Sequence, residues 1–255
     1  MAQYDDAFIE RLELVWGEGF LSPGGPEEVG DIVRGLDLAG RRILDIGCGT
    51  GGPAVVLARD MGAEVVGIDI EEGPLARAAR HVETAALGER VTLRRVEPGP
   101  LPFEDAAFDV VFSKDSLLHV ADRPAIFAEI ARVLVPGGAL AASDWFAGVE
   151  GREHPALRAY LDRAHLEIAP ATTLETMQAL QAAGFTRVRM RDRAQWFEAR
   201  IAEENRALEG RLRPDLERIM GPKDAEEALA ARRALGAAAS ARALRPAHIR
   251  ATLPG

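Results

Sequence analysis

Residues 43–52 constrain the fold most, because a short apolar run there passes directly into a cluster of glycines, Ile-Leu-Asp-Ile-Gly-Cys-Gly-Thr-Gly-Gly. Apolar residues followed by glycines are typical of a buried parallel strand that turns sharply into a helix, where glycine lets the backbone come close to a ligand. A second apolar run begins at Val65 and ends at Asp69, whose carboxylate can accept hydrogen bonds from both hydroxyls of an adenosine ribose. The pattern predicts a nucleotide-cofactor site where two neighbouring strands end.

Two cofactor classes use this geometry. The spacing Gly47-x-Gly49-x-x-Gly52 also satisfies the dinucleotide fingerprint. Asp45 lies before the first glycine, where its negative charge suits the ammonium group of a methionine but would repel a pyrophosphate. This charge favours S-adenosylmethionine over NAD, and it disfavours NAD-dependent oxidoreduction.

Two later segments support the same choice. Residues 108–112 are Phe-Asp-Val-Val-Phe, and residues 133–140 are Val-Leu-Val-Pro-Gly-Gly-Ala-Leu. They resemble the fourth strand, the following helix and the fifth strand of class I methyltransferases. The resemblance implies that S-adenosylmethionine is the cofactor, held through Gly47, Gly49, Gly51 and Asp69.

The composition narrows the classes of partner. A formal net charge of −9 argues against non-specific nucleic-acid binding, because no basic surface replaces the counterions around phosphates. The acidic N-terminus and the lack of eighteen consecutive apolar residues predict no membrane segment. Cys48 is the single cysteine, and no His, Cys, Asp and Glu spacing suggests a metal. We expect a cytoplasmic monomer or homodimer that acts on a small molecule, without nucleic acid, membrane or metal.

The order of apolar runs and helical spacings predicts an α/β fold, with a doubly wound, mostly parallel seven-stranded sheet of the Rossmann-like type and a helical cap or insertion. The predicted strands are 42–46, 64–69, 90–95, 108–113, 138–144, 187–190 and 248–253. The predicted helices are 5–16, one that begins at 26, 52–60, 73–86, 123–133, 153–167, 173–183 and a long stretch, 196–243, broken at Pro214 and at Gly221–Pro222. The expected parts are an N-terminal helix and lid (1–25), a cofactor-binding core (26–147), cap helices with the sixth strand (148–195), a helical insertion (196–246) and a final strand (247–255).

His119 is the candidate general base. It follows the fourth predicted strand by a few residues, and histidine titrates near neutrality. Methyl transfer from a sulfonium mainly needs alignment of the acceptor, but an ammonium acceptor must also lose a proton. Asp115 lies four residues earlier, on the same face of one helical turn. The alternative interpretation of His119 is a structural histidine at the start of a helix.

Longer motifs resemble the phosphoethanolamine N-methyltransferases of the single-domain type. They comprise residues 16–25, Trp-Gly-Glu-Gly-Phe-Leu-Ser-Pro-Gly-Gly, the glycine loop, residues 113–119, residues 143–145 and a tail that ends in a short strand. The match covers most of the chain.

The resemblance implies roles for individual residues. Tyr4 and His119 would form a catalytic pair that closes the site and manages the acceptor proton, and Asp115 would hold the acceptor amine. The implied cofactor contacts come from Leu21, Ser22, Asp45, Gly47, Gly49, Gly51, Asp69, Ile70, Glu97, Pro98 and Lys114.

The phosphate-binding positions depart from that family. Its members gather tyrosines and an arginine around the substrate phosphate, whereas the corresponding positions here are Leu12, Trp145, Tyr160, Ala164 and Leu166, and only Tyr160 is retained. Because the arginine fork is hard to replace at a phosphate, the departures predict a different acceptor. Trp145 would offer an aromatic face to a methylated cation. The expected acceptor contacts are Leu12, Asp115, Trp145 and Tyr160.

The expected function is S-adenosylmethionine-dependent methylation of a small molecule, at an amine nitrogen. One alternative is O- or S-methylation of a small acid or thiol, in which His119 would deprotonate the hydroxyl or thiol. Another is a non-catalytic protein that binds S-adenosylmethionine. For residues 196–243, a solvated helical hairpin is the plain interpretation, and ligand contacts from Arg232, Arg233 or Arg242 are the alternative.

Overall fold

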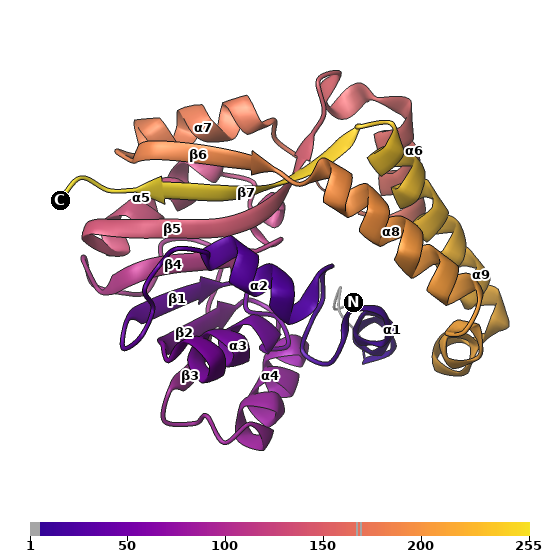
Figure 1. Cartoon of the computed structure of the whole chain (residues 1–255), viewed down its shortest axis with the longest axis horizontal. Coiled ribbons are helices and arrows are strands. Elements are labelled where there is room, and N and C mark those ends of the chain that lie inside the picture. Colours follow the sequence, from indigo (N-terminus) through magenta and orange to yellow (C-terminus); the bar gives the residue numbers. More distant parts are fainter. Residues whose placement is uncertain (1–5, 167, 169) are drawn as a thin grey trace.

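A seven-stranded sheet in the order β3-β2-β1-β4-β5-β7-β6 forms the centre of the protein (Figure 1). The computed structural model describes residues 6–166, 168 and 170–255. The strands are β1 Arg42–Ile46, β2 Glu64–Asp69, β3 Val91–Arg95, β4 Phe108–Lys114, β5 Leu134–Ala147, β6 Thr186–Asp192 and β7 Leu244–Thr252. Strands β1 to β5 pair in parallel, and β7 runs antiparallel to both β5 and β6. The predicted doubly wound α/β fold is confirmed.

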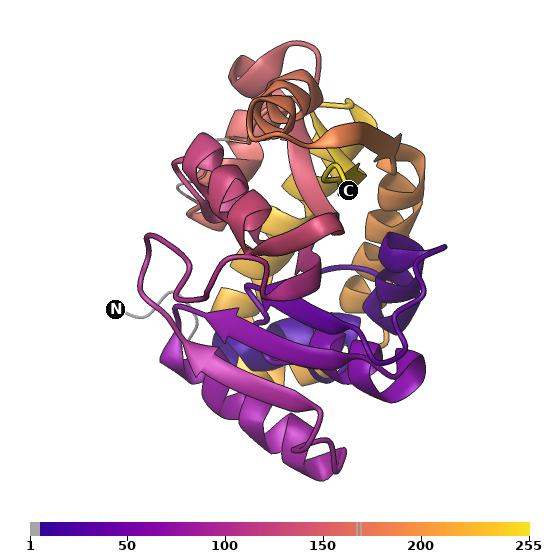
Figure 2. The ribbon, with the colours of Figure 1, turned by 90° about the vertical axis from the view of Figure 1, so that its left-hand side faces the viewer.

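Helices cover both faces of this sheet, as the turned view shows (Figure 2). Side chains alternate between the faces of a strand, so neighbouring residues of β1 enter different cores. Ile43 packs in the core with α2 (Gly25–Val33), α3 (Gly52–Met61) and α4 (Glu72–Thr84). Leu44 packs in the core with α5 (Arg123–Val133) and α7 (Thr173–Ala182). The near-continuous burial of β1 and β4 follows from this double cover.

The remaining long helices lie beyond one end of the sheet. Helices α6 (Pro155–Ala164), α8 (Ala194–Glu209) and α9 (Arg213–Ser240) pack together, and α8 and α9 form a long hairpin (Figure 1). Helix α1 (Asp6–Trp16) packs against α9 through Leu14 and Val15. The parallel strands therefore end in the direction of α1 and the hairpin, and this arrangement places the site.

Several predicted boundaries were wrong. The helical stretch is not interrupted at Pro214, because this proline lies in the first turn of α9, where proline is tolerated. The stretch is interrupted at Gly210, where α8 ends. Gly221 does interrupt α9, with φ 80°. The predicted helix 153–167 is shorter. A short 3₁₀ turn, η2 (Gly151–Glu153), precedes the helix, and His154 Nδ1 accepts the Ala156 N–H at the start of the helix. The helix ends at His165, which has φ 51°.

Three strands are clearly longer than predicted. β6 spans Thr186–Asp192 rather than 187–190. β5 begins at Leu134 rather than 138, and β7 begins at Leu244 rather than 247 or 248. Their antiparallel ladder runs without a break from Ala139 opposite Thr252 to Ala147 opposite Leu244. The end of β5 at Ala147 and the start of β7 at Leu244 thus depend on a partner about a hundred residues away, which the local pattern does not contain. The early start of β5 comes from pairing of Leu134 with Phe108 of β4. In the described part of the chain, no helix is long and apolar enough to cross a membrane.

Candidate active site

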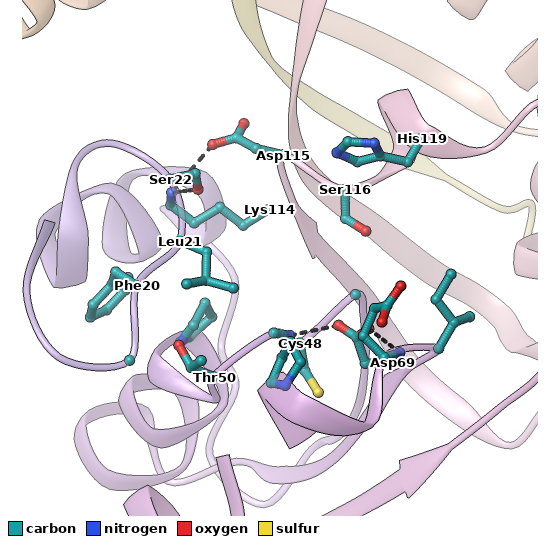
Figure 3. A pocket seen from close by; sticks show the side chains of 17 residues that line it. Phe20, Leu21, Ser22, Cys48, Thr50, Asp69, Lys114, Asp115, Ser116 and His119 are labelled. Atoms are coloured by element: carbon teal, nitrogen blue, oxygen red, sulfur yellow. Dashed lines mark hydrogen bonds and ion pairs between the residues drawn. The ribbon is translucent and has the colours of Figure 1, made fainter. Parts of the chain in front are cut away.

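A pocket of about 810 Å³, including its open mouth, lies at the carboxyl ends of β1, β2 and β4. Its floor is the glycine loop that follows β1, and one wall is the segment between α1 and α2, residues 17–24, which we call the lid (Figure 3). Another wall is the chain that follows β4, with Asp115, Ser116 and His119. This is the position where open parallel sheets bind ligands.

Only glycine fits where the glycine loop comes closest to neighbouring side chains. Gly47 has φ 72°, and a Cβ atom there would lie 1.8 Å from Ser116 Oγ. Gly49 has φ 53°, and a Cβ there would approach Leu21. Both line the pocket. Gly51 does not line it; this residue precedes α3 and lies against Ala78, so its place in the motif reflects helix packing.

Asp45 is a buried carboxylate with an unsatisfied oxygen. Its side chain is 1% exposed, and Oδ2 has no hydrogen-bond partner among the described residues. Burial, and to a lesser extent the nearby Asp69 carboxylate, raises the pKa of Asp45 to about 8. Asp45 does not itself line the pocket, although Gly47, two residues further on, does. An ammonium group that reached the Asp45 oxygen would satisfy it and restore its charge, which is the contact expected for the amino acid end of the cofactor.

Asp69 is held toward the pocket by two backbone groups. Its Oδ2 accepts the Gly49 N–H at 2.9 Å, and its Oδ1 accepts the Glu71 N–H at 3.0 Å. Each carboxylate oxygen has a further acceptor position, so Asp69 can still accept ribose hydroxyls. The neighbouring Ile70 is 48% exposed and lies at the rim of the pocket, where it provides an apolar surface for a flat base.

Glu97 and Pro98 lie outside this pocket. They line a separate shallow cavity with Arg94 and Arg95, formed by the loop after β3. The Glu97 side chain is 82% exposed, and its carboxylate is 3.9 Å from the Arg95 guanidinium. The structure does not bring these two residues together with the other expected cofactor contacts.

The lid is fastened to the rest of the pocket at both ends. The Gly52 N–H donates to the Gly19 carbonyl at 2.9 Å, and the Gly19 N–H donates to Glu13 Oε1 at 2.9 Å. Leu21 and Ser22 line the pocket, as expected. Lys114 lies beneath Ser22 and donates to its hydroxyl.

Asp115 and His119 both line the pocket; Asp115 lies beside Ser22 of the lid, and His119 lies farther from the lid, on the side of Asp69 (Figure 3). Asp115 has φ 53°, a strained conformation for a residue with a side chain, and Ser143 Oγ donates to its Oδ1 at 2.8 Å. His119 ends a short 3₁₀ turn, η1 (Leu117–His119). The protein around the ring lowers the pKa of His119, although the Asp69 charge opposes the shift. The imidazole is therefore neutral at pH 7 and can take a proton.

Other expected site residues are placed elsewhere. Tyr4 lies outside the described residues. Trp145 and Tyr160 are buried in an apolar cluster with Phe197, and the Trp145 and Phe197 ring centroids are 5.2 Å apart. Ala164 and Leu166 pack against the same cluster, and Leu12 is half-buried on α1. None of these five apolar or aromatic positions lines the pocket.

Sequence reasoning missed one buried carboxylate beside the site. Asp144, at the end of β5, accepts the backbone N–H groups of Leu118 at 3.2 Å and Trp145 at 3.0 Å. Burial raises the pKa of Asp144 to about 7, despite the Arg123 guanidinium 3.5 Å away. Asp144 thus supports the turn that carries His119. The sequence did carry a signal for Asp144, because this acidic residue follows an apolar run and belongs to the motif at residues 143–145.

Two of the three arginines considered in the hairpin bind carboxylates. Arg232 donates to Glu204 Oε2 at 2.7 Å and to Asn205 Oδ1 at 3.1 Å, and its guanidinium lies over the Trp16 ring. Arg233 donates to Glu209 and Glu226. The contacts of Arg233 agree with the plain interpretation, a solvated helical hairpin, whereas the pair of Arg232 and Glu204 is largely buried.

Comparisons with known proteins agree with the geometry of the pocket. The methyltransferase domain family matches residues 44–142. Over 210 residues, 81% of this chain, the sequence is 32% identical to phosphoethanolamine N-methyltransferase 3 of Arabidopsis thaliana, of which 41% is covered. It is 38% identical over 152 residues, 55% of this chain, to the 27-O-demethylrifamycin SV methyltransferase of Amycolatopsis mediterranei, of which 56% is covered.

A solved structure extends the similarity to nearly the whole chain. Phosphoethanolamine N-methyltransferase 2 of Haemonchus contortus, in complex with phosphomonomethylethanolamine and S-adenosylhomocysteine, matches with a TM-score of 0.90 and 26% identity. The match covers 99% of this chain and 59% of that one. This chain spans about two fifths of the length of its plant relative. The chain therefore has the fold of the class I methyltransferases and resembles, over most of its length, the phosphoethanolamine N-methyltransferases.

Proposed function

We propose that this protein transfers a methyl group from S-adenosylmethionine to the amine nitrogen of a small molecule. One observation carries the proposal: a single pocket is lined by the glycine loop, by Asp69, and by Asp115 and His119. The unsatisfied Asp45 carboxylate lies two residues before Gly47, behind this lining. The similarity to phosphoethanolamine N-methyltransferases supports the same reaction class.

The residues present fit the cofactor. Asp45 would receive its ammonium group, Asp69 its ribose hydroxyls, and Ile70 one face of its adenine. Gly47 and Gly49 leave room for its backbone-like amino acid part. When bound, S-adenosylmethionine supplies a methyl group on a cationic sulfur, and the sulfur departs as a neutral thioether.

Asp115 and His119 would act on the acceptor. Asp115 is fixed from one side by Ser143 and from the other by Lys114, and its charge attracts an ammonium group. His119 has a pKa lowered by the protein that surrounds its ring, so it is neutral at pH 7 and can accept the proton that frees the nitrogen lone pair. Tyr4 stays a proposed partner of His119, since this role rests on the family resemblance alone.

We further propose that the acceptor differs from phosphoethanolamine. The positions that correspond to the family phosphate clamp carry Leu12, Trp145, Ala164 and Leu166, and the last three belong to an apolar cluster. Arg232, the best placed arginine of the hairpin, is already paired with Glu204. Apolar side chains at these positions cannot replace the hydrogen bonds and charge that a bound phosphate needs, so they disfavour a phosphorylated amine.

The test is a screen of small amines, thiols and acids for formation of S-adenosylhomocysteine. We expect saturable turnover of an amine by the full chain, and turnover lowered about 10²–10⁴-fold in a variant with His119→Ala. Turnover restricted to hydroxyls or thiols would favour O- or S-methylation. Binding of S-adenosylmethionine without turnover of any acceptor would favour a non-catalytic role, and failure to bind it would reject the proposal.

A further inference from the structure

Lys114 joins the lid to the acceptor carboxylate through one buried ammonium group. Its side chain is 3% exposed. Nζ donates to Ser22 Oγ at 2.5 Å and to the Pro23 carbonyl at 2.9 Å, both in the lid, and to Asp115 Oδ2 at 3.3 Å (Figure 3). An ammonium group has three donors, so these three acceptors use all of them.

Two of the three acceptors belong to the lid. If residues 22 and 23 moved away, Lys114 would keep only Asp115 as a partner while its stem stayed at the end of β4. Water can replace these acceptors once the lid has moved, but hydrogen bonds from a charged donor within the protein give a net stabilisation over those to water. The closed position of the lid is therefore stabilised by Lys114.

The lid also covers the glycine loop. Phe20, Leu21 and Ser22 line the pocket, and Leu21 lies close enough to meet a Cβ on Gly49 at 3.1 Å. A ligand on the glycine loop would therefore contact the lid, and movement of the lid would widen the way out of the pocket.

From this geometry we propose that Lys114 is a latch, a positioning residue that sets the rate at which the cofactor enters and leaves. The same ammonium holds Asp115, whose other oxygen is held by Ser143, so closure of the lid and orientation of the acceptor carboxylate occur together. This inference rests on the proposed function only in placing the cofactor in this pocket.

A different role for Lys114 would be to bind the carboxylate of the cofactor directly, as the family resemblance implies. In that case the cofactor would have to displace one of the three acceptors from Nζ. The two roles predict different effects. If Lys114 holds the lid, it slows the exit of any ligand under the lid. If Lys114 binds the carboxylate of the cofactor, it slows only the exit of molecules that carry a carboxylate.

The test compares S-adenosylhomocysteine with 5′-methylthioadenosine, which lacks the amino acid part. Dissociation rates are measured by stopped-flow tryptophan fluorescence, with Trp16 next to the lid as a reporter, on the full chain and three variants. We expect Lys114→Met to raise the dissociation rate of both ligands by the same factor, about tenfold or more. Ser22→Ala, which removes one lid acceptor, should raise both rates less. Lys223→Met, at an exposed lysine of α9, is the matched control and should change neither.

Three results would overturn the latch. A faster release of S-adenosylhomocysteine alone would assign Lys114 to the carboxylate, and unchanged release of both ligands would leave Lys114 without control of the lid. If Lys114→Met fails to fold by circular dichroism, Ser22→Ala decides, and unchanged release by that variant rejects the latch. If the unmodified chain binds neither ligand, the proposed function fails instead.

Discussion

Binding of the cofactor should release a proton from Asp45. In the ligand-free protein, burial and then the charge of Asp69 raise the pKa of Asp45 to about 8. At pH 7 the carboxyl group is then about 0.9 protonated, and a bound ammonium group requires it to be charged. Binding of S-adenosylhomocysteine, which keeps the ammonium group, should therefore release about 0.9 proton at pH 7 and about 0.1 at pH 9.

The pH dependence of the binding free energy follows from the same pKa. Removing the proton at pH 7 costs about 1.4 kcal/mol, one pH unit below the pKa. The affinity should thus rise about ninefold between pH 6 and pH 7 and level off above pH 8. Asp45→Asn removes the titrating group, so its affinity should be lower and nearly independent of pH in this range.

Calorimetry measures the released protons directly. The apparent enthalpy of binding at pH 7 is compared in phosphate and in Tris, whose ionisation enthalpies differ widely. 5′-Methylthioadenosine, which has no ammonium group, is the ligand control, and Asp45→Asn is the protein control; neither should release a proton. Equal enthalpies in both buffers for S-adenosylhomocysteine would refute the reasoning, because Asp45 would then be ionised before binding or remain protonated afterwards.

Asp45 should also affect the ligand-free protein. Between the ordinary carboxyl pKa and about 8, the folded state holds a proton that the unfolded state has released. The free energy of unfolding must then decrease as pH rises through this window. Asp45→Asn should flatten this decrease in urea titrations, although Asp144, with a pKa of about 7, contributes a slope of the same sign. A steeper decrease in the variant would contradict the assignment.

Three further predictions concern the rest of the site. Asp69→Ala should weaken binding of S-adenosylhomocysteine by about 1.5–3 kcal/mol in calorimetry, the range for hydrogen bonds to charged groups; an unchanged affinity would remove Asp69 from the ribose site. His119→Ala should lower turnover about 10²–10⁴-fold with little change in cofactor affinity, and because the His119 pKa is lowered, activity of the unmodified protein should persist below pH 6.5 in a pH–rate profile. Phosphoethanolamine should be a poor substrate, since Leu12, Ala164 and Leu166 provide no phosphate clamp; efficient, saturable methylation would show that another cation binds the phosphate.

The parts that sequence predicted well depend on local rules. The bounds of β1 and β2 and of α5 follow from apolar periodicity, an acidic N-cap at Asp122 and a proline after it, all within a few residues of the element concerned. The glycine loop and Asp69 could also be predicted from local sequence. A strand that turns into a helix at a cofactor needs glycine at positions such as Gly47, whatever packs around it.

The tertiary structure alone decided contacts between distant segments. Insertion of β7 between β5 and β6 lengthened both neighbouring strands beyond their local signals, and burial turned Asp45 and Asp144 into carboxyl groups with raised pKa values. Ser22 and Lys114, 92 residues apart, meet only because the lid folds over the end of β4. Periodicity and motif spacing describe neighbours along the chain, whereas burial and hydrogen-bond partners depend on which segments the fold brings together.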